Sequence, residues 1–376
     1  MGQRSPFQSA MLICSGDQGL DDHLKLWCRI RTCLFSSVLV LCLLTGFFVI
    51  PLTGSVRAAN APVCTRNVLP VRLSPLIPTV YQVVGWLCYT GSLNQYQLVQ
   101  LLVHGATYHH LYWDFTYQPE KYSYVRAMVS AGYATFNIDR IGNGESDHPI
   151  PELVTIQANA YVVHQIVGAL KAGSIQGHVF HKVLLVGHSV GSAISVAESA
   201  TYADVDGVLL TGFLHFVDPA VLPTLTADVY PADMDPLFRN IGLSPGYLTT
   251  KPNTRGQLFY YLPNADTNVI ATDEATKETI TDSEFATFFS ISNSMVSQRI
   301  HVPVLVAVGQ YDNIFCLGTF YCTNANAVGT YESLYYAPQA QLKVVVIPNA
   351  GHDLNLQINA PTGWYPQAIQ WVDSTF

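Results

Sequence analysis

Charged residues are scarce in this chain. Asp, Glu, Lys and Arg make up 12 % of its 376 residues, about half the usual share, while hydrophobic residues make up 49 %. Basic residues are the scarcer kind, at 18 Lys and Arg against 26 Asp and Glu. Because the sequence contains no basic cluster, nucleic acid and anionic lipid surfaces are not expected as partners.

Patterns typical of metal and glycan sites are missing as well. No CxxC pair and no HExxH motif occurs, and His109-His110 is too compact to place two ligands on one helical face. We therefore expect no metal ion and no other cofactor. No Asn-x-Ser/Thr sequence occurs, so nothing indicates N-glycosylation.

One long apolar run stands near the N-terminus. Cys33 to Leu52 contains no charged residue, and Lys25, Arg29 and Arg31 precede it. This pattern predicts an export signal or a membrane anchor. Small residues before position 59 favour cleavage of a leader at residues 1–58, and retention as one N-terminal transmembrane segment is the alternative. Either arrangement places the rest of the chain outside the cytoplasm, as a secreted or an anchored protein.

Cysteine usage agrees with export. Four of the eight cysteines fall in the predicted leader, which leaves Cys64, Cys88, Cys316 and Cys322. The short separation of the last two makes Cys316–Cys322 the natural local disulfide, with Cys64–Cys88 as the second. Four buried free thiols are the alternative. Without residues 1–58 the chain keeps 13 Lys and Arg against 23 Asp and Glu, so the exported part is acidic.

Short apolar runs alternate with helical patterns along most of the remaining chain. Strands are predicted at 69–73, 79–89, 97–103, 134–138, 183–186, 207–211, 303–308 and 343–347. Helices are predicted at 119–131, 156–171, 324–336 and 361–372, and after the strand at 183–186. This alternation predicts an α/β fold: a mostly parallel sheet with helices on both faces, opened by two antiparallel strands.

The alternation stops between Phe213 and Arg299. These 87 residues are rich in Pro, Asp, Thr and aromatic side chains. A structureless loop of that length would be unusual in a compact domain. We therefore predict an inserted helical cap at about 213–299, within a single domain that spans 59–376.

The stretch from Lys182 to Ala203 carries the first sign of chemistry. Apolar residues 183–186 are followed by Gly187-His188-Ser189-Val190-Gly191 and then by small, helix-compatible residues. Strand, sharp turn and helix in this order predict a nucleophile elbow that presents Ser189 at the edge of the sheet. Glycine is expected on both sides of the serine because the helix must pass close to the strand.

Two later strands end in residues that could activate this serine. Asp312 follows the strand at 303–308, and His352 follows the strand at 343–347. The carboxyl ends of parallel strands share one edge of the sheet, so we expect both side chains near Ser189. His352 would act as the general base and Asp312 would orient it, with Asp218 as the alternative acid.

Together these motifs resemble the α/β-hydrolase superfamily over residues 65–376. The matching pieces are HGAT at 104, DRIGNGESDHP at 139, GHSVG at 187, GQYD at 309 and NAGHDLNL at 349. The resemblance is to capped, secreted or membrane-anchored serine hydrolases of unassigned substrate, and it implies their fold and a Ser189-Asp312-His352 triad. In the second piece Ile141 replaces the usual Arg, and Arg140 stands one place earlier. We expect a structural loop there.

The resemblance also assigns supporting residues. The backbone N–H groups of Ala106 and Val190 are expected to form the oxyanion hole. His104 and His188 are expected to tie loops together beneath the site. Three side chains are expected at the mouth of the substrate pocket, with packing as the alternative for the last two: Thr107, His109 and Trp113.

These observations predict a serine hydrolase that cleaves an ester, thioester or lactone through an acyl-enzyme. The aromatic residues of the predicted cap favour a small apolar molecule as substrate, and a membrane would be contacted only through the N-terminal segment. Carbon–carbon hydrolysis and acyl transfer use the same residues and stay open. A catalytically silent domain used for binding is the alternative from another class, although all three triad positions are filled.

Overall fold

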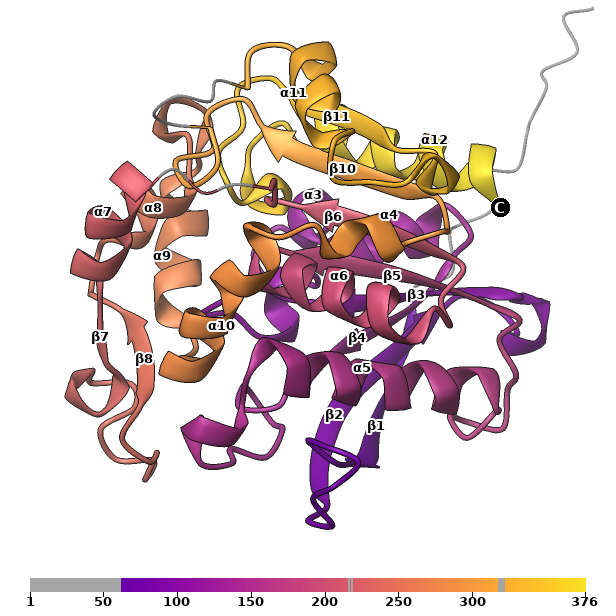
Figure 1. Cartoon of the computed structure of the whole chain (residues 1–376), viewed down its shortest axis with the longest axis horizontal. Helices are drawn as coiled ribbons and strands as arrows, with labels where there is room; N and C mark the ends of the chain where they lie inside the picture. The colour runs from indigo at the N-terminus through magenta and orange to yellow at the C-terminus, as the bar shows by residue number, and fades with distance from the viewer. Residues whose placement is uncertain (1–61, 216, 218, 317–321) are drawn as a thin grey trace, which may run out of the picture. The chain divides into compact units, whose positions relative to one another are not determined.

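The computed structural model describes residues 62–215, 217, 219–316 and 322–376 (Figure 1). The predicted leader at 1–58 lies outside these residues, as does Asp218, the alternative acid. Within the described part of the chain, no helix is both long and apolar enough to cross a bilayer.

The main sheet has eight strands in the order β1-β2-β4-β3-β5-β6-β10-β11. Their bounds are β1 Val63–Val71, β2 Tyr81–Tyr89, β3 Leu98–Val103, β4 Ala134–Ile138, β5 Lys182–His188, β6 Gly207–Thr211, β10 Val304–Gly309 and β11 Lys343–Ile347. β2 runs antiparallel to β1 and to β4, and all other pairs are parallel. This topology confirms the predicted fold class.

Helices cover both faces of the sheet, as parallel strands require. α5 (Ile156–Lys171) and α6 (Val190–Tyr202) pack against each other, and α4 (Tyr124–Ser130) packs against α12 (Tyr365–Thr375) (Figure 1). α11 (Ala325–Glu332) lies against β11. The central strands β4, β5, β6 and β10 are buried almost throughout, which explains their continuous apolar sequences.

The helix predicted at 119–131 is interrupted. It forms as α3 (Pro119–Tyr122) and α4, with Ser123 between them in an extended conformation. The hydroxyl of Ser123 accepts a hydrogen bond from the backbone N–H of Arg126, 3.0 Å away, and so caps α4. The break therefore comes from a capping residue inside a helical pattern.

The chain between β6 and β10 contains helices and a small sheet of its own. The helices are α7 Leu222–Ala227, α8 Arg255–Phe259, α9 Thr267–Ala275 and α10 Asp282–Ser292. The strands β7 Val229–Pro231, β8 Tyr247–Thr250 and β9 Ile280–Thr281 pair antiparallel in a separate sheet, which the sequence analysis did not predict. We call residues 213–299 the insertion.

Buried polar contacts join the insertion to the main sheet. Arg140, which follows β4, forms a fully buried ion pair with Glu284 of α10. On the other side, the backbone N–H of Asp353 donates to the carbonyl of Phe259, 3.0 Å away. A Cβ on Gly351 would lie 2.5 Å from the backbone nitrogen of Tyr261, so only glycine fits there. The end of α8 therefore packs directly on the loop after β11.

Two disulfide bonds close loops of different kinds. Cys64–Cys88 joins the antiparallel strands β1 and β2 at a directly paired position. Cys316–Cys322 closes a short loop after β10, and the backbone N–H of Cys316 donates to the carbonyl of Asp312, 2.9 Å away. The second disulfide therefore lies next to one of the predicted site residues.

Candidate active site

Ser189 occupies a strained turn between β5 and α6. Its φ and ψ are 52° and −116°, a conformation that residues with side chains rarely adopt. A Cβ on Gly187 would lie 2.5 Å from the carbonyl oxygen of Gly191, and a Cβ on Gly191 would lie 2.1 Å from that of Val103. Both flanking positions are thus closed to larger residues, as the sequence predicted.

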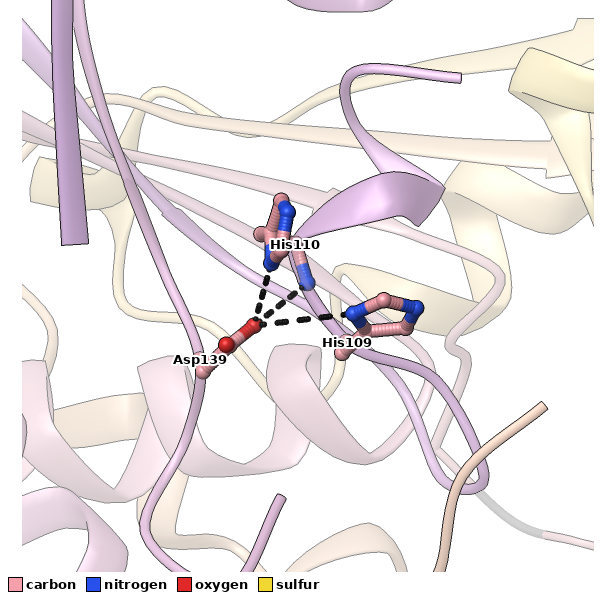
Figure 2. Close-up of side chains that lie close together, drawn as sticks. All are labelled: His109, His110 and Asp139. Atoms are coloured by element: carbon pink, nitrogen blue, oxygen red, sulfur yellow. Dashed lines mark hydrogen bonds and ion pairs between the residues drawn. The ribbon is translucent and has the colours of Figure 1, made fainter. Parts of the chain in front are cut away.

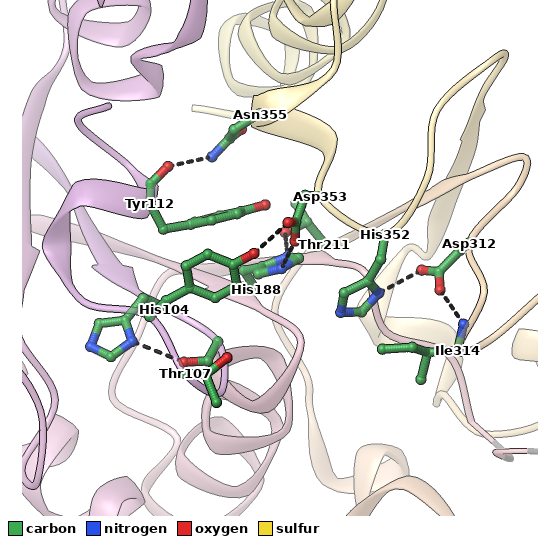
Figure 3. A network of polar contacts seen from close by, with 12 residues as sticks. His104, Thr107, Tyr112, His188, Thr211, Asp312, Ile314, His352, Asp353 and Asn355 are labelled. Carbon is green, nitrogen blue, oxygen red and sulfur yellow. Dashed lines mark hydrogen bonds and ion pairs between the residues drawn. The ribbon is translucent and has the colours of Figure 1, made fainter. Parts of the chain in front are cut away.

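His352 and Asp312 are hydrogen-bonded to each other. Nδ1 of His352 lies 2.8 Å from Oδ2 of Asp312, and both side chains are buried. The other oxygen of Asp312 accepts backbone N–H bonds from Ile314 and Phe315, at 2.8 and 3.1 Å. These two bonds fix the carboxylate with Oδ2 toward the imidazole (Figure 3).

The electrostatic setting of His352 favours a basic imidazole. Burial on its own would lower the pKa of His352, but the charge and hydrogen bond of Asp312 outweigh it, so the pKa is raised above the ordinary value of 6.5. Nε2 of His352 is buried and has no hydrogen-bond partner among the described residues. It is therefore free to accept a proton from another group.

Ser189 and His352 line the same narrow cavity, of about 80 Å³. Its walls are almost entirely apolar, and more than half of its lining residues come from the insertion. These are Val217, Leu225, Val229, Thr250, Leu258, Phe259, Ile280, Phe285, Phe288 and Phe289. The other lining residues are Ala106, Thr107, Tyr108, Ser189, Val190, Ile314 and His352.

Of the three side chains expected at the pocket mouth, only Thr107 lines the cavity. Trp113 is fully buried and packs edge-on against Tyr124, so it belongs to the core. His109 is turned toward Asp139 (Figure 2). The placement of His109 and Trp113 in the pocket is therefore corrected.

Two backbone N–H groups are available at the cavity. Ala106 and Val190 both line it, and neither N–H has a hydrogen-bond partner within the described part of the chain. Val190 is the first residue of α6, where backbone N–H groups have no partner within the helix. Both can therefore donate to an oxygen atom bound next to Ser189.

His109, His110 and Asp139 form a compact cluster whose ligand-type atoms lie within 4.8 Å of one another (Figure 2). The backbone N–H and Nδ1 of His110 both lie 2.8 Å from Oδ1 of Asp139. The backbone N–H of Glu145 donates to Oδ2, also at 2.8 Å. N–H groups thus already occupy both oxygens of Asp139, and the cluster joins the loops after β3 and β4.

The two histidines expected to support the site are fully buried. Nε2 of His104 accepts a hydrogen bond from the backbone N–H of Arg140, 3.0 Å away. His188 lies between Thr211 and Asp353, with its ring stacked on Tyr112 at 4.1 Å between centroids. A polar cluster beyond His188 was not predicted from the sequence, and it contains Tyr108, Arg255, Tyr260, Asp273 and Asp353.

Comparison with known proteins bears on this arrangement. A sequence model of the alpha/beta hydrolase family matches residues 100–363. No curated protein matches the chain. A bromoperoxidase from Bacillus anthracis is similar in structure, with a TM-score of 0.55 and 16 % identity over 82 % of this chain and 100 % of that one.

Two further solved structures carry different activities on a similar fold. A soluble variant of monoglyceride lipase from Saccharomyces cerevisiae has a TM-score of 0.54 and 15 % identity over 82 % of this chain and 96 % of the lipase. The enol-lactonase from Burkholderia xenovorans LB400 has a TM-score of 0.53 and 16 % identity over 78 % of this chain and 97 % of the lactonase. At these identities the likeness concerns the fold alone.

Proposed function

Because this chain belongs to the alpha/beta hydrolase family, we propose that it is a serine hydrolase that uses Ser189, His352 and Asp312. The observation that carries the proposal is the convergence of a strained serine and a free imidazole nitrogen on one cavity. An aspartate behind the imidazole completes the arrangement that acyl transfer requires.

Each group has a defined task in the proposed reaction. Nε2 of His352 takes the proton of the Ser189 hydroxyl, and the serine oxygen attacks the substrate carbonyl. Asp312 keeps the proton of the neutral imidazole on Nδ1 and stabilises the charged form. The N–H groups of Ala106 and Val190 bind the oxyanion, and each such donor is worth roughly 3 to 4 kcal/mol in comparable sites.

The second half of the reaction reverses the proton transfers. His352 gives its proton to the leaving alcohol, thiol or ring oxygen, and the acyl-enzyme remains on Ser189. Water then enters, His352 removes its proton, and the resulting oxygen nucleophile attacks the acyl carbon. The acid is released and Ser189 regains its hydrogen.

The walls of the cavity indicate the substrate class. Among the described residues, no Asp, Glu, Lys or Arg side chain lines it, and three aromatic residues of α10 do: Phe285, Phe288 and Phe289. A charged acyl group would lose its hydration there without gaining a partner, so it is disfavoured. We infer a neutral ester, thioester or lactone whose acyl part is small and apolar.

The experiment that tests the function is labelling with a fluorophosphonate probe, which reacts with an activated serine. The full-length protein should be labelled, and Ser189→Ala should not be labelled although it folds equally well. Graded p-nitrophenyl esters and a few lactones would then identify the preferred acyl length. Absence of labelling in the wild-type protein would instead favour a domain that only binds ligands.

We also propose that the enzyme is exported. The disulfides Cys64–Cys88 and Cys316–Cys322 support this, because such bonds persist mainly in oxidising compartments. Mass analysis of exported material should find both bonds, together with a mature N-terminus near residue 59. A chain that keeps residues 1–58 and partitions into membranes would support anchoring instead.

A further inference from the structure

A second buried carboxyl group lies beside the proposed triad. Asp353 directly follows His352 and is fully buried. Its Oδ1 lies 3.1 Å from Nε2 of His188, and its Oδ2 accepts a short hydrogen bond from the hydroxyl of Tyr108. Figure 3 shows Asp353 directed toward His188, whereas His352 faces Asp312 on the other side.

The bonds of Asp353 connect two loops and the end of β5 in the proposed active site. Tyr108 stands two residues after Ala106, in the loop that supplies one N–H to the oxyanion. His188 immediately precedes Ser189, and Asp353 immediately follows His352. A change at this one carboxyl group would therefore reach the nucleophile, the base and the oxyanion donors together.

The hydrogen bonds around His188 indicate where the protons are. The hydroxyl of Thr211 donates its only proton to the carbonyl of Gly187, 3.1 Å away. The same hydroxyl lies 3.1 Å from Nδ1 of His188; because the carbonyl of Gly187 can only accept, we assign the hydroxyl proton to that carbonyl and the proton of the second contact to Nδ1. Burial holds the pKa of His188 well below its ordinary value, which leaves the ring neutral and Nε2 without a proton. With this tautomer, the contact of Nε2 with Asp353 places the proton on the carboxyl group.

The charges of Asp273 and Arg255 also favour a protonated Asp353. Asp273 is paired with Arg255 through two hydrogen bonds of 2.9 and 2.7 Å, and it also accepts one from Tyr260. Arg255 is therefore already matched by one carboxylate. A second negative charge on Asp353 would lie close to the first in a buried cluster, which is unfavourable.

The pKa of Asp353 agrees with this proton count. Burial and the nearby charge of Asp273 raise it from 3.8 to about 8. The other titratable or charged groups that act on it or are acted on by it are His352, Tyr108, Tyr112, His188, Arg255 and Tyr260. Of these, His352, Arg255 and the hydrogen bond of Tyr108 lower the pKa without outweighing burial.

We propose that Asp353 is a positioning residue for Ser189 and His352, and that it works as an uncharged carboxylic acid which donates to His188 and accepts from Tyr108. This proposal rests on the proposed serine hydrolase function. A charged Asp353 would raise the pKa of His352 further, so that less of the imidazole would be neutral near pH 7 and able to accept the proton of Ser189. Asp312 thus supplies the charge, and Asp353 supplies the alignment.

Two substitutions separate an uncharged from a charged role. Asp353→Asn keeps one donor for His188 and one acceptor for Tyr108, so it should retain at least about a third of wild-type kcat. Asp353→Leu removes both bonds, and kcat should fall about 100-fold with little change in KM, as expected for a small misplacement of reacting groups. If Asp353→Asn loses as much kcat as Asp353→Leu, the carboxyl group acts as an anion and the proposal fails.

Folding must be controlled, because Asp353→Leu places an apolar group in a polar cluster. Tyr108→Phe is the second variant, since it removes a single hydroxyl. It should lower kcat at least several-fold while circular dichroism and thermal unfolding stay close to wild type. An unchanged kcat in a folded Tyr108→Phe protein would contradict the alignment role.

Infrared spectroscopy tests the protonation state without any activity. At pH 7 the wild-type protein should show a carboxylic acid carbonyl band that is absent from Asp353→Asn and that disappears as the pH rises past about 8. No difference between the two spectra would overturn the proposal. The band would persist even if fluorophosphonate failed to label Ser189, so failure of the proposed function and failure of this inference can be told apart.

Discussion

The imidazole of His352 is held by Asp312 at 2.8 Å, and the same carboxylate is fixed from behind by two backbone N–H groups. The aspartate thus has one oxygen committed to the main chain and one to the histidine. This division of its two oxygens determines what happens when one of them is replaced.

Asp312→Asn should lower kcat by about four orders of magnitude. The amide oxygen will keep the backbone N–H bonds of Ile314 and Phe315, which turns the NH₂ group toward Nδ1 of His352. Nδ1 must then accept, so the proton moves to Nε2 and the base is blocked. Kinetics with a p-nitrophenyl ester measure the loss, and a loss below tenfold would mean that another acid orients His352.

On the acid side, the pH profile of kcat/KM should have a midpoint higher than the pKa of an ordinary histidine. His352 must be neutral to accept a proton, and its pKa is raised above 6.5 because Asp312 outweighs burial. Activity should therefore be lost as the pH falls through a midpoint higher than 6.5. Measuring kcat/KM with an uncharged ester reports this value for the free enzyme, and a midpoint at or below 6.5 would contradict the assignment.

Asp353 should make the folded state less stable as the pH rises. Between pH 3.8 and about 8 this group carries a proton in the folded protein and none in the unfolded chain. Stability falls with pH wherever the folded state binds more protons, by up to about 1.4 kcal/mol per pH unit for one group. Urea unfolding at pH 5, 6 and 7 should show a steeper decline for wild type than for Asp353→Asn, and parallel curves would count against a neutral carboxyl group.

We expect Cys64–Cys88 to contribute mainly to stability and Cys316–Cys322 to contribute to activity. Replacing Cys64 and Cys88 by Ser opens a loop of 24 residues and should lower the free energy of unfolding by about 3 kcal/mol, with kcat unchanged in the folded fraction. Replacing Cys316 and Cys322 should cost less stability but lower kcat, because Cys316 is bonded to the main chain of Asp312. Equal kcat in both double variants would show that the second disulfide does not support the site.

Phe289→Ala should shift the acyl-length preference toward longer chains. Phe289 lines the cavity and is only partly buried, so its removal adds space beside Ser189 without opening the core. The ratio of kcat/KM for a long ester over a short one should rise at least about tenfold, the effect expected for one or two methylene groups. Phe115→Ala, a core position outside the cavity, is the control and should leave this ratio unchanged.

The turn that holds Ser189 and the strands that precede Asp312 and His352 could be predicted from the sequence, because their patterns involve residues close together in the chain. Glycine at 187 and 191 is explained by contacts within one strand, turn and helix, so the elbow could be recognised from adjacent residues. Asp312 and His352 follow two mostly apolar strands, and the parallel direction expected for these strands indicated that both residues lie at the same edge of the sheet.

The small sheet of the insertion and the polar contacts of Asp353 could not be predicted from the sequence, because the strands are short and the contacts join residues far apart in the chain. The strands of the insertion have two to four residues, too few for a period to show. Tyr108 and Asp353 are 245 residues apart, so no local pattern shows that they form a hydrogen bond. Neither the composition nor the residue spacing indicates that Asp353, next to His352, is buried.

The packing of α8 on the loop after β11 limits how this enzyme can be re-engineered. The carbonyl of Phe259 accepts a hydrogen bond from Asp353, and the main chain of Tyr261 lies against Gly351. The segment that lines the pocket therefore also positions the loop that carries His352, the proposed base. Grafting the corresponding segment of a relative would disturb His352 together with specificity. Phe285 and Phe289 of α10 line the same cavity from another helix, and we expect single replacements there to change substrate range with less effect on His352.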